Sequence, residues 1–296
     1  MMSDCRLCPR DCGADRRKGK KGFCLSTGTL RVARASLHFW EEPCLSKDKG
    51  SGTVFFSGCN LRCVYCQNRD IAISQSGKEI TEERLVEIFY ELREKGALNI
   101  NLVTPSHYIY PIARCIRKAK DQGFDLPFVY NTSAYEKADT LKILDGLIDI
   151  YMPDFKYWTS EAGERYSHAP DYPDMAKMAI DEMFRQRPRC EYDSDGVMKK
   201  GMIVRHMLIP KHVYDAKKIF EYLYKTYGDN VTYSIMSQYT PMSHFDDYPE
   251  LNRTVTQKEY NSLLDFCIEL GIENAYIQDP GTACESFVPS FDNTGV

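Results

Sequence analysis

The chain has 296 residues, of which 43% are hydrophobic and 27% charged, a composition that suits one large α/β domain or two small ones. Its formal net charge is −4, which argues against a general nucleic-acid-binding protein. There is no apolar run of about 18 residues and no secretory signal, which predicts a cytoplasmic protein with no membrane partner. The 12 cysteines are then interpreted as metal ligands and not as a disulfide framework.

Residues 1–30 are predicted to form a small cysteine-rich module. Cys5, Cys8 and Cys12 follow the pattern C-x2-C-x3-C, and Cys24 comes after a basic, glycine-containing loop. Four thiols so close in sequence can close one zinc site or hold one iron–sulfur cluster, and the spacing alone does not choose between them. Free thiols in a mobile tail are the alternative.

Residues 31–52 are predicted to connect this module to the next motif. Within them, the segment HFWEEPC is dense in reactive residue types. His38 or Cys44 could serve as an extra metal ligand. The interpretation that we favour is an ordered lid packed by Phe39 and Trp40.

From residue 53 onward, strand-like and helix-like segments alternate. Repeated βα units produce a parallel sheet with helices on its outer face. The region 53–280 is shorter than the ~250 residues typical of a closed eight-unit barrel, so we expect an open, partial (β/α)6 barrel, followed by a tail, 281–296. The expected strands are 53–56, 99–103, 127–130, 148–152, 202–209, 231–236 and 275–277, and the expected helices are 81–96, 110–122, 137–144, 171–187, 213–227 and 256–270.

A second cysteine motif follows the first of these strands. Cys59, Cys63 and Cys66 are spaced C-x3-C-x2-C, and Gly58 would let the backbone approach a bound group closely. A closed structural metal site normally has four protein ligands, so three thiolates favour a [4Fe–4S] cluster with one iron open to a small molecule. The alternative is a zinc knuckle that borrows a fourth ligand.

This spacing, with the aromatic Tyr65 just before the third cysteine, resembles the radical S-adenosylmethionine (SAM) superfamily. The resemblance implies that SAM chelates the open iron and that one electron from the cluster cleaves it to a 5′-deoxyadenosyl radical. It also implies a (β/α)6 partial barrel, Tyr65 near the adenine, and reduced flavodoxin or ferredoxin as electron donor.

Polar residues occur where the predicted strands end, which is where parallel βα folds place their functional groups. Arg205 lies inside an apolar strand and needs a carboxylate partner, and SAM carries one. The predicted cofactor-binding residues are Tyr65, Thr104, Ser106, Asn131, Ser133, Asp154, Lys156, Arg205 and Gln238.

The order of these blocks resembles the pyruvate formate-lyase activating enzyme branch of the superfamily. The resemblance implies that the turn 131–133 contacts the SAM ribose and that Arg205 reaches the SAM carboxylate, and Asp154-x-Lys156 matches a D-x-K block of that branch. Two features depart from the branch. Its acidic turn, which holds the SAM amino group, is replaced by 104–106, and its histidine on strand six is not evident near Gln238.

The predicted function is therefore hydrogen abstraction from a protein or peptide substrate, as in a glycyl-radical activase, with no catalytic side chain identified. A radical SAM enzyme acting on a small molecule or a ribosomal peptide is the first alternative, and a non-enzymatic zinc-binding interaction protein is the second.

Several of these residues also have plain structural interpretations. Asp154 and Lys156 could form an ion pair, Arg205 could pair with a core carboxylate, and Thr104 and Ser106 could cap the following helix. Residues expected to be structural or plain thiols are His107, His206, His244, Cys115, Cys190, Cys267 and Cys284, and those expected in the core are Met175, Met178 and Met183.

Overall fold

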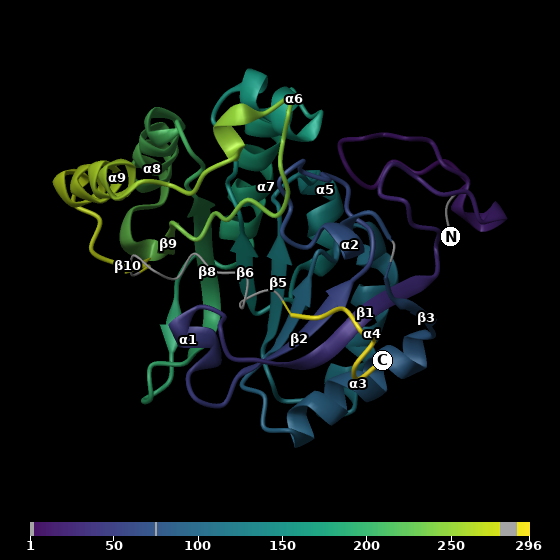
Figure 1. Cartoon of the computed structure of the whole chain (residues 1–296). Helices are drawn as coiled ribbons and strands as arrows, with labels where there is room; N and C mark the ends of the chain where they lie inside the picture. The colour runs from purple at the N-terminus through teal and green to yellow at the C-terminus, as the bar shows by residue number, and fades with distance from the viewer. Residues whose placement is uncertain (1–2, 75, 279–288) are drawn as a thin grey trace.

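The computed structural model describes residues 3–74, 76–278 and 289–296 (Figure 1). It confirms the predicted βα repeat. Seven strands of one sheet run parallel and follow each other in chain order. They are β2 (Ser51–Phe56), β4 (Ile100–Val103), β5 (Phe128–Thr132), β6 (Ile150–Pro153), β8 (Met198–Met207), β9 (Thr232–Met236) and β10 (Ala275–Ile277).

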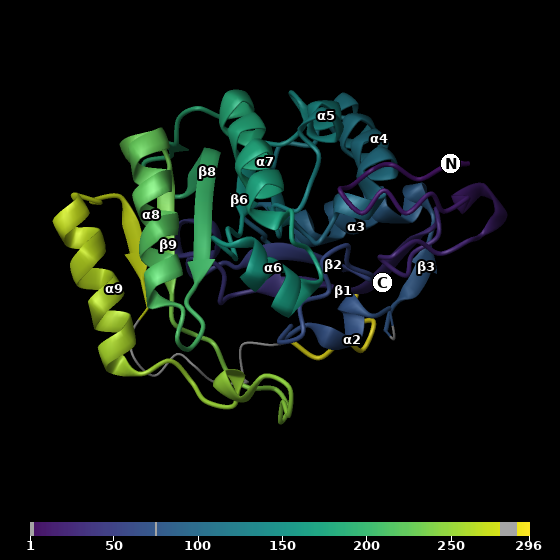
Figure 2. The same ribbon diagram turned by 90° about the horizontal axis from the view of Figure 1, so that it is seen from above.

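Helices cover the outer face of this sheet in an arc, from α3 at one end to α9 at the other (Figure 2). The sheet does not close on itself in the described part of the chain, because β10 lies at one edge and β3 at the other. This is the predicted open, partial barrel. The helices are α1 (Pro43–Ser46), α2 (Arg69–Ala72), α3 (Glu82–Glu94), α4 (Ile109–Asp121), α5 (Ala138–Leu141), α6 (Ser160–Ser167), α7 (Tyr172–Gln186), α8 (Val213–Tyr227) and α9 (Gln257–Leu270).

Sequence signals explain where two of the longer helices, α3 and α9, begin. The Thr81 side chain accepts a hydrogen bond from the backbone N–H of Arg84 at the start of α3, and Thr256 and Glu259 form a capping box at the start of α9. The apolar face of α3 is fully buried, as the helical spacing of its hydrophobic residues predicts. Within the described ranges, no helix combines the length and apolarity needed to cross a membrane.

The segment predicted as a connection contains a strand instead. β1 (Leu30–His38) pairs antiparallel with β2 and also with the short strand β3 (Lys78–Ile80). Its arginines and serine interrupt the apolar pattern, so the sequence did not indicate a strand. The expected lid is not packed down by its aromatic residues, because Phe39 is 50% exposed and Trp40 is 67% exposed.

Two smaller differences concern the middle of the chain. Helix α6 was not predicted, although Thr159 caps its first turn. The strand β7 (Glu191–Tyr192) pairs antiparallel with β8 at its start. Met183 is buried as expected, but Met178 is 45% exposed and so lies outside the core.

The last residues of the predicted tail lie along β1. The backbone N–H of Ala35 donates to the carbonyl oxygen of Thr294 (2.8 Å), and that of Asn293 donates to Ala33 (3.0 Å). The C-terminus therefore lies next to the strand that extends the sheet (Figure 1). The predicted boundary at 280/281 and Cys284 lie outside the described residues.

Candidate active site at the strand ends

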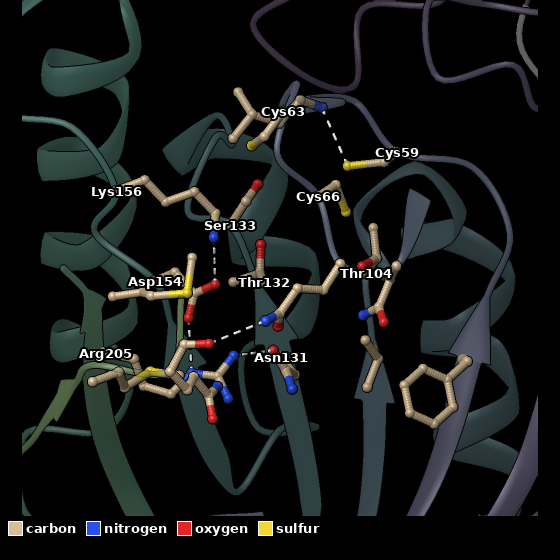
Figure 3. Close-up of a pocket in the computed structure, with 18 of the residues that line it drawn as sticks. Cys59, Cys63, Cys66, Thr104, Asn131, Thr132, Ser133, Asp154, Lys156 and Arg205 are labelled. Atoms are coloured by element: carbon tan, nitrogen blue, oxygen red, sulfur yellow. Dashed lines mark hydrogen bonds and ion pairs between the residues drawn. The ribbon is translucent and has the colours of Figure 1, made fainter. Parts of the chain in front are cut away.

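A pocket opens at the carboxyl ends of the parallel strands, beneath the loop that carries the second cysteine motif (Figure 3). Six successive strands each contribute residues from their carboxyl ends to the wall of the pocket. Residues at those ends that line the pocket include Phe55, Val103, Thr104, Asn131, Thr132, Ser133, Asp154, Lys156, Arg205, Met207, Met236 and Gln238. The strand-end rule thus identified the location of the pocket correctly.

The three loop cysteines, Cys59, Cys63 and Cys66, also line this pocket. The backbone N–H groups of Leu61 and Arg62 point at the sulfur of Cys59, at 3.4 and 3.5 Å. Burial raises the pKa of the Cys66 thiol to about 12, so a bound cation is needed to keep it as thiolate at neutral pH. Three sulfur ligands with N–H donors on one pocket rim fit a thiolate-bound metal cluster.

Close packing requires glycine at position 58. Gly58 has a φ of +94°, and a Cβ there would lie 2.2 Å from the hydroxyl of Ser26 and 2.6 Å from the carbonyl oxygen of Cys24. The loop can therefore approach the N-terminal module only because this residue has no side chain.

We expect Gly58→Ala to destabilise the protein by at least ~2 kcal/mol more than Gly123→Ala, because the second glycine has a similar φ of +82° but nothing within 4 Å of its Cβ position. The control measures backbone strain alone, which costs about 1 kcal/mol. Unfolding free energies from denaturant titration provide the comparison. Equal losses in the two variants would show that the contact with the N-terminal module does not matter.

Charged side chains form a network on the pocket floor. Arg205 donates from Nε to Asp154 (2.7 Å), from Nη1 to Glu41 (3.1 Å) and from Nη2 to Asn131 (2.8 Å). Lys156 donates to the second carboxylate oxygen of Asp154 (2.7 Å). Two cations and two carboxylates thus meet within one partly buried network, of which Figure 3 labels Asp154, Lys156 and Arg205.

The network keeps its members charged. Burial would raise the pKa of Asp154, but the neighbouring charges of Arg205 and Lys156 outweigh burial and hold this pKa below its usual value. Burial would lower the pKa of Lys156, but Asp154 raises it above its usual value. The pocket therefore presents fixed charges of both signs to a ligand at neutral pH.

Most predicted cofactor-binding residues come together here, and one does not. Tyr65, Thr104, Asn131, Ser133, Asp154, Lys156, Arg205 and Gln238 all line the pocket. Ser106 is not part of that lining. Its hydroxyl donates to the buried carboxylate of Glu136 (2.9 Å), which also accepts from Tyr130 (2.8 Å). The geometry thus gives Ser106 a packing role beside the pocket.

Thr104 is the strained residue of the pocket wall. Its φ of +57° is rare for a β-branched side chain, whose γ atoms crowd the backbone there. Its backbone N–H donates to the carbonyl oxygen of Asn131 (2.9 Å), which ties the ends of β4 and β5 together. We interpret this conformation as one that the surrounding pocket imposes.

Glu41 is a charged residue of the pocket that the sequence did not single out as a site residue. It follows β1, and besides Arg205 it accepts a hydrogen bond from the side chain of Asn101 (2.7 Å). The pair of acidic residues in the HFWEEPC segment was the available signal. It could not be interpreted without the strand β1, which carries this segment to the pocket.

The remaining cysteines lie elsewhere. All 11 cysteines in the described ranges are free thiols. Cys44 is 2% exposed in a separate apolar cluster with Leu45 and Met198, so it is not near the loop motif. Among the described residues, no group of three His, Cys, Asp or Glu side chains is arranged to hold a single metal ion.

The histidines have structural contacts, as expected. His107 bonds through Nε2 to the carbonyl oxygen of Ser57 (2.8 Å). His206 is 3% exposed and donates from Nδ1 to the carbonyl oxygen of Phe155 (2.7 Å), while its Nε2 has no partner among the described residues. Burial lowers the pKa of His206 to about 4, so it is neutral at physiological pH.

This lowered pKa makes the fold sensitive to acid. Below about pH 6.5 the unfolded chain gains a proton at His206, whereas the folded chain gains it only near pH 4. We expect the unfolding free energy to fall between pH 7 and pH 5 by about 2 kcal/mol more in the native chain than in His206→Gln. His244→Gln is the control, because that side chain is 74% exposed. Identical pH profiles for the native chain and His206→Gln would contradict the prediction.

Comparison with known proteins agrees with this geometry. Residues 53–192 match the family model of the radical SAM superfamily. An uncharacterized protein of Methanocaldococcus jannaschii is 27% identical over 286 residues, which cover 93% of this chain and 78% of that protein. The pyruvate formate-lyase 1-activating enzyme of Escherichia coli K12 is 52% identical over 33 residues, only 11% of this chain and 13% of that enzyme.

Two solved structures share the fold. A radical SAM methyltransferase from Sphaerobacter thermophilus has a TM-score of 0.52 at 14% identity, over 77% of this chain and 66% of its own. Streptococcus suis SuiB bound to precursor peptide SuiA has a TM-score of 0.51 at 12% identity, over 76% of this chain and 47% of its own. The match to the radical SAM family model covers residues 53–192, the part of the chain that carries the loop cysteines and the ends of β2, β4, β5 and β6 that line the pocket.

Proposed function

We propose that Cys59, Cys63 and Cys66 hold a [4Fe–4S] cluster and that SAM binds in the strand-end pocket. The observation that carries this proposal is the position of the three thiols on the rim of the one pocket whose walls carry the predicted SAM contacts. When bound, the cluster and SAM supply a 5′-deoxyadenosyl radical by one-electron cleavage of the sulfonium. A donor of the reduced flavodoxin or ferredoxin class would supply that electron.

The chain's own residues then bind and orient the cofactor. Glu41 and Asp154 offer carboxylates to the SAM ammonium group, which compensates for the acidic turn that this chain lacks after β4. Arg205 and Lys156 retain N–H bonds that can reach the SAM carboxylate, since a guanidinium has five and an ammonium three. Asn131 and Ser133 are proposed to bind the ribose, and Tyr65, which also lines the pocket, is proposed to contact the adenine.

The substrate that we propose is a protein or peptide. A second hollow adjoins the pocket and shares Trp40, Glu41 and Gln238 with it. It continues along the start of α1 past the exposed ring of Phe39, which gives an extended path suited to a polypeptide. The short match to the E. coli activating enzyme supports a similar substrate class, and SuiB provides a peptide-bound example of the fold.

The experiment is anaerobic reconstitution followed by addition of dithionite and SAM. We expect 5′-deoxyadenosine to form, and its absence from a chain with an intact cluster would contradict the proposal. A colourless, zinc-containing protein prepared without oxygen would favour the interaction-protein alternative.

The same assay distinguishes the substrate classes. An anaerobic cell extract is separated by size, and each fraction is tested for faster 5′-deoxyadenosine formation. Stimulation by the protein fraction that is lost after protease treatment supports a polypeptide substrate. Stimulation by the small-molecule fraction alone would favour the alternative of a small-molecule substrate.

A further inference from the structure

The N-terminal module is ordered with very little regular structure. Within residues 3–29 the only helix is one 3-10 turn, Arg16–Lys18, and there is no strand. Leu7 is the one large aliphatic residue that is buried, yet Cys5 and Cys24 are only 2% and 4% exposed. A segment with so small an apolar core needs a cross-link to hold its shape, and its cysteines are not joined by disulfides.

The four thiols of this module lie near one another, since Cys5 and Cys8 both interact electrostatically with Cys24, and Cys5 also interacts with Cys12. A Cβ added at Gly22 would lie 2.9 Å from the sulfur of Cys12 and 3.7 Å from that of Cys24. A backbone N–H from two residues further along the chain acts on each of the turn cysteines and lowers the pKa of its thiol. The pairs are Cys5 with Leu7, Cys8 with Arg10 and Cys12 with Ala14. The loop cysteines have the same arrangement, from Leu61 to Cys59 and from Asn68 to Cys66.

A buried arginine without a carboxylate indicates that an anion belongs among these thiols. Arg16 is 5% exposed and donates to the carbonyl oxygen of His107 (2.7 Å) and to the sulfur of Cys24 (3.1 Å). Its Nε has no partner among the described residues. Burying a guanidinium without countercharge is costly, and a cluster of metal-bound thiolates would supply that charge.

Two more arginines tie the module to the second cysteine motif. The guanidinium groups of Arg10 and Arg62 both stack on the ring of Phe23, at 3.9 and 3.8 Å from its centroid. Arg10 also donates to the carbonyl oxygens of Asn60 (2.8 Å) and Leu61 (3.3 Å), which belong to the loop. In the part of the chain that the structure describes, none of Arg10, Arg16 and Arg62 has an ion-pair partner.

The place of the module suggests which metal it holds. A hollow outside the strand-end pocket is lined by Phe23, Arg62 and Arg69 together with Cys63 and Cys66. An electron donor that approaches the loop from this side meets the N-terminal module. Zinc has no redox chemistry, whereas an iron–sulfur cluster can accept and release an electron there.

We propose that Cys5, Cys8, Cys12 and Cys24 bind a second, redox-active [4Fe–4S] cluster packed against the loop of Cys59, Cys63 and Cys66. All four of its irons have a protein thiolate, so this cluster has no open position for SAM. The choice of iron over zinc rests on the proposed radical function of the loop, whereas the existence of a metal–thiolate site rests on the module itself.

The test uses the full chain, prepared without oxygen, and three variants. They are Cys8→Ser/Cys24→Ser, Cys59→Ser/Cys63→Ser/Cys66→Ser, and the control Cys267→Ser. We expect about eight irons and eight sulfides per native chain and per control chain, and about four of each in the other two variants. The loop variant, once reduced, should give an electron paramagnetic resonance signal that SAM does not change.

The outcomes separate this proposal from the proposed function. About four irons with one zinc per native chain, or no iron and no signal in the loop variant, would overturn the second cluster. The loop variant tests the second cluster even if the N-terminal variant fails to fold, because the cysteines of the N-terminal module are unchanged in it. A native chain with both clusters that makes no 5′-deoxyadenosine would overturn the radical function and leave the second cluster standing.

Discussion

Cys63→Ala is expected to lose the loop cluster and to reduce 5′-deoxyadenosine formation by more than ~100-fold. Cys63 lines the pocket with Cys59 and Cys66, and two remaining thiolates cannot hold the cluster in place. Changes to residues that only orient a metal ligand already cost ~10–100-fold, so loss of a ligand should cost more. Iron content, the visible absorption of the cluster and product formation measured by chromatography provide the readouts.

Cys115→Ala is the matched control for this prediction. Cys115 is 1% exposed on α4, and its thiol donates weakly to the carbonyl oxygen of Glu82 (3.5 Å), far from the pocket residues. Truncating it should cost about 1 kcal/mol of stability and leave iron content and product formation nearly unchanged. If Cys63→Ala kept the iron and activity of this control, the loop would not be the cluster site.

The fold could be predicted because its signals are local. The helices α3 and α9 show this best, because each begins at a capping threonine, Thr81 or Thr256, and α9 ends at Gly271. The strand β1 could not be predicted, because its stabilisation is not local. It pairs with β2 on one side and with β3 on the other, and its polar residues reach partners such as Asp292 near the end of the chain.

The location of the pocket could be predicted, and the ion pair of Asp154 with Lys156 was one of the predicted alternatives, but the identity of the carboxylates that bind Arg205 could not be predicted. Repeated βα units bring strand ends together, so Asn131, Asp154 and Arg205 were expected to be neighbours. The partner of Arg205 was left open between SAM and a core carboxylate. Only the structure identifies Glu41 as a partner, because it lies 164 residues away in sequence and reaches the pocket through β1. Contacts at such separations leave no periodic signal in a single sequence.

Arg205→Met is expected to lower the unfolding free energy by about 3–5 kcal/mol. The guanidinium is 12% exposed and binds two carboxylates, Asp154 and Glu41, which are 20% and 10% exposed. Removing it leaves both carboxylates partly buried with less countercharge, and only Lys156 remains to pair with Asp154. Denaturant titration of the apo chain measures this loss without any contribution from bound SAM.

A surface arginine gives the control for Arg205→Met. Arg114 pairs with Glu82 on the outside of the helix layer, and the two side chains are 57% and 37% exposed. Arg114→Met should cost less than ~1 kcal/mol, because water solvates the glutamate that it leaves behind. Equal losses in the two variants would mean that the pocket network is as well hydrated as the surface pair.

Neutralising the stranded carboxylate of Glu41 should recover part of the loss. In Arg205→Met, Asp154 keeps Lys156 as a partner, whereas Glu41 loses the cation that it pairs with. We therefore expect Arg205→Met/Glu41→Gln to be more stable than Arg205→Met alone. SAM affinity should not recover with stability, because in our proposal the Glu41 carboxylate attracts the SAM ammonium group. A double variant that regained both stability and SAM binding would assign the network a purely structural role and place the cofactor contacts elsewhere in the pocket.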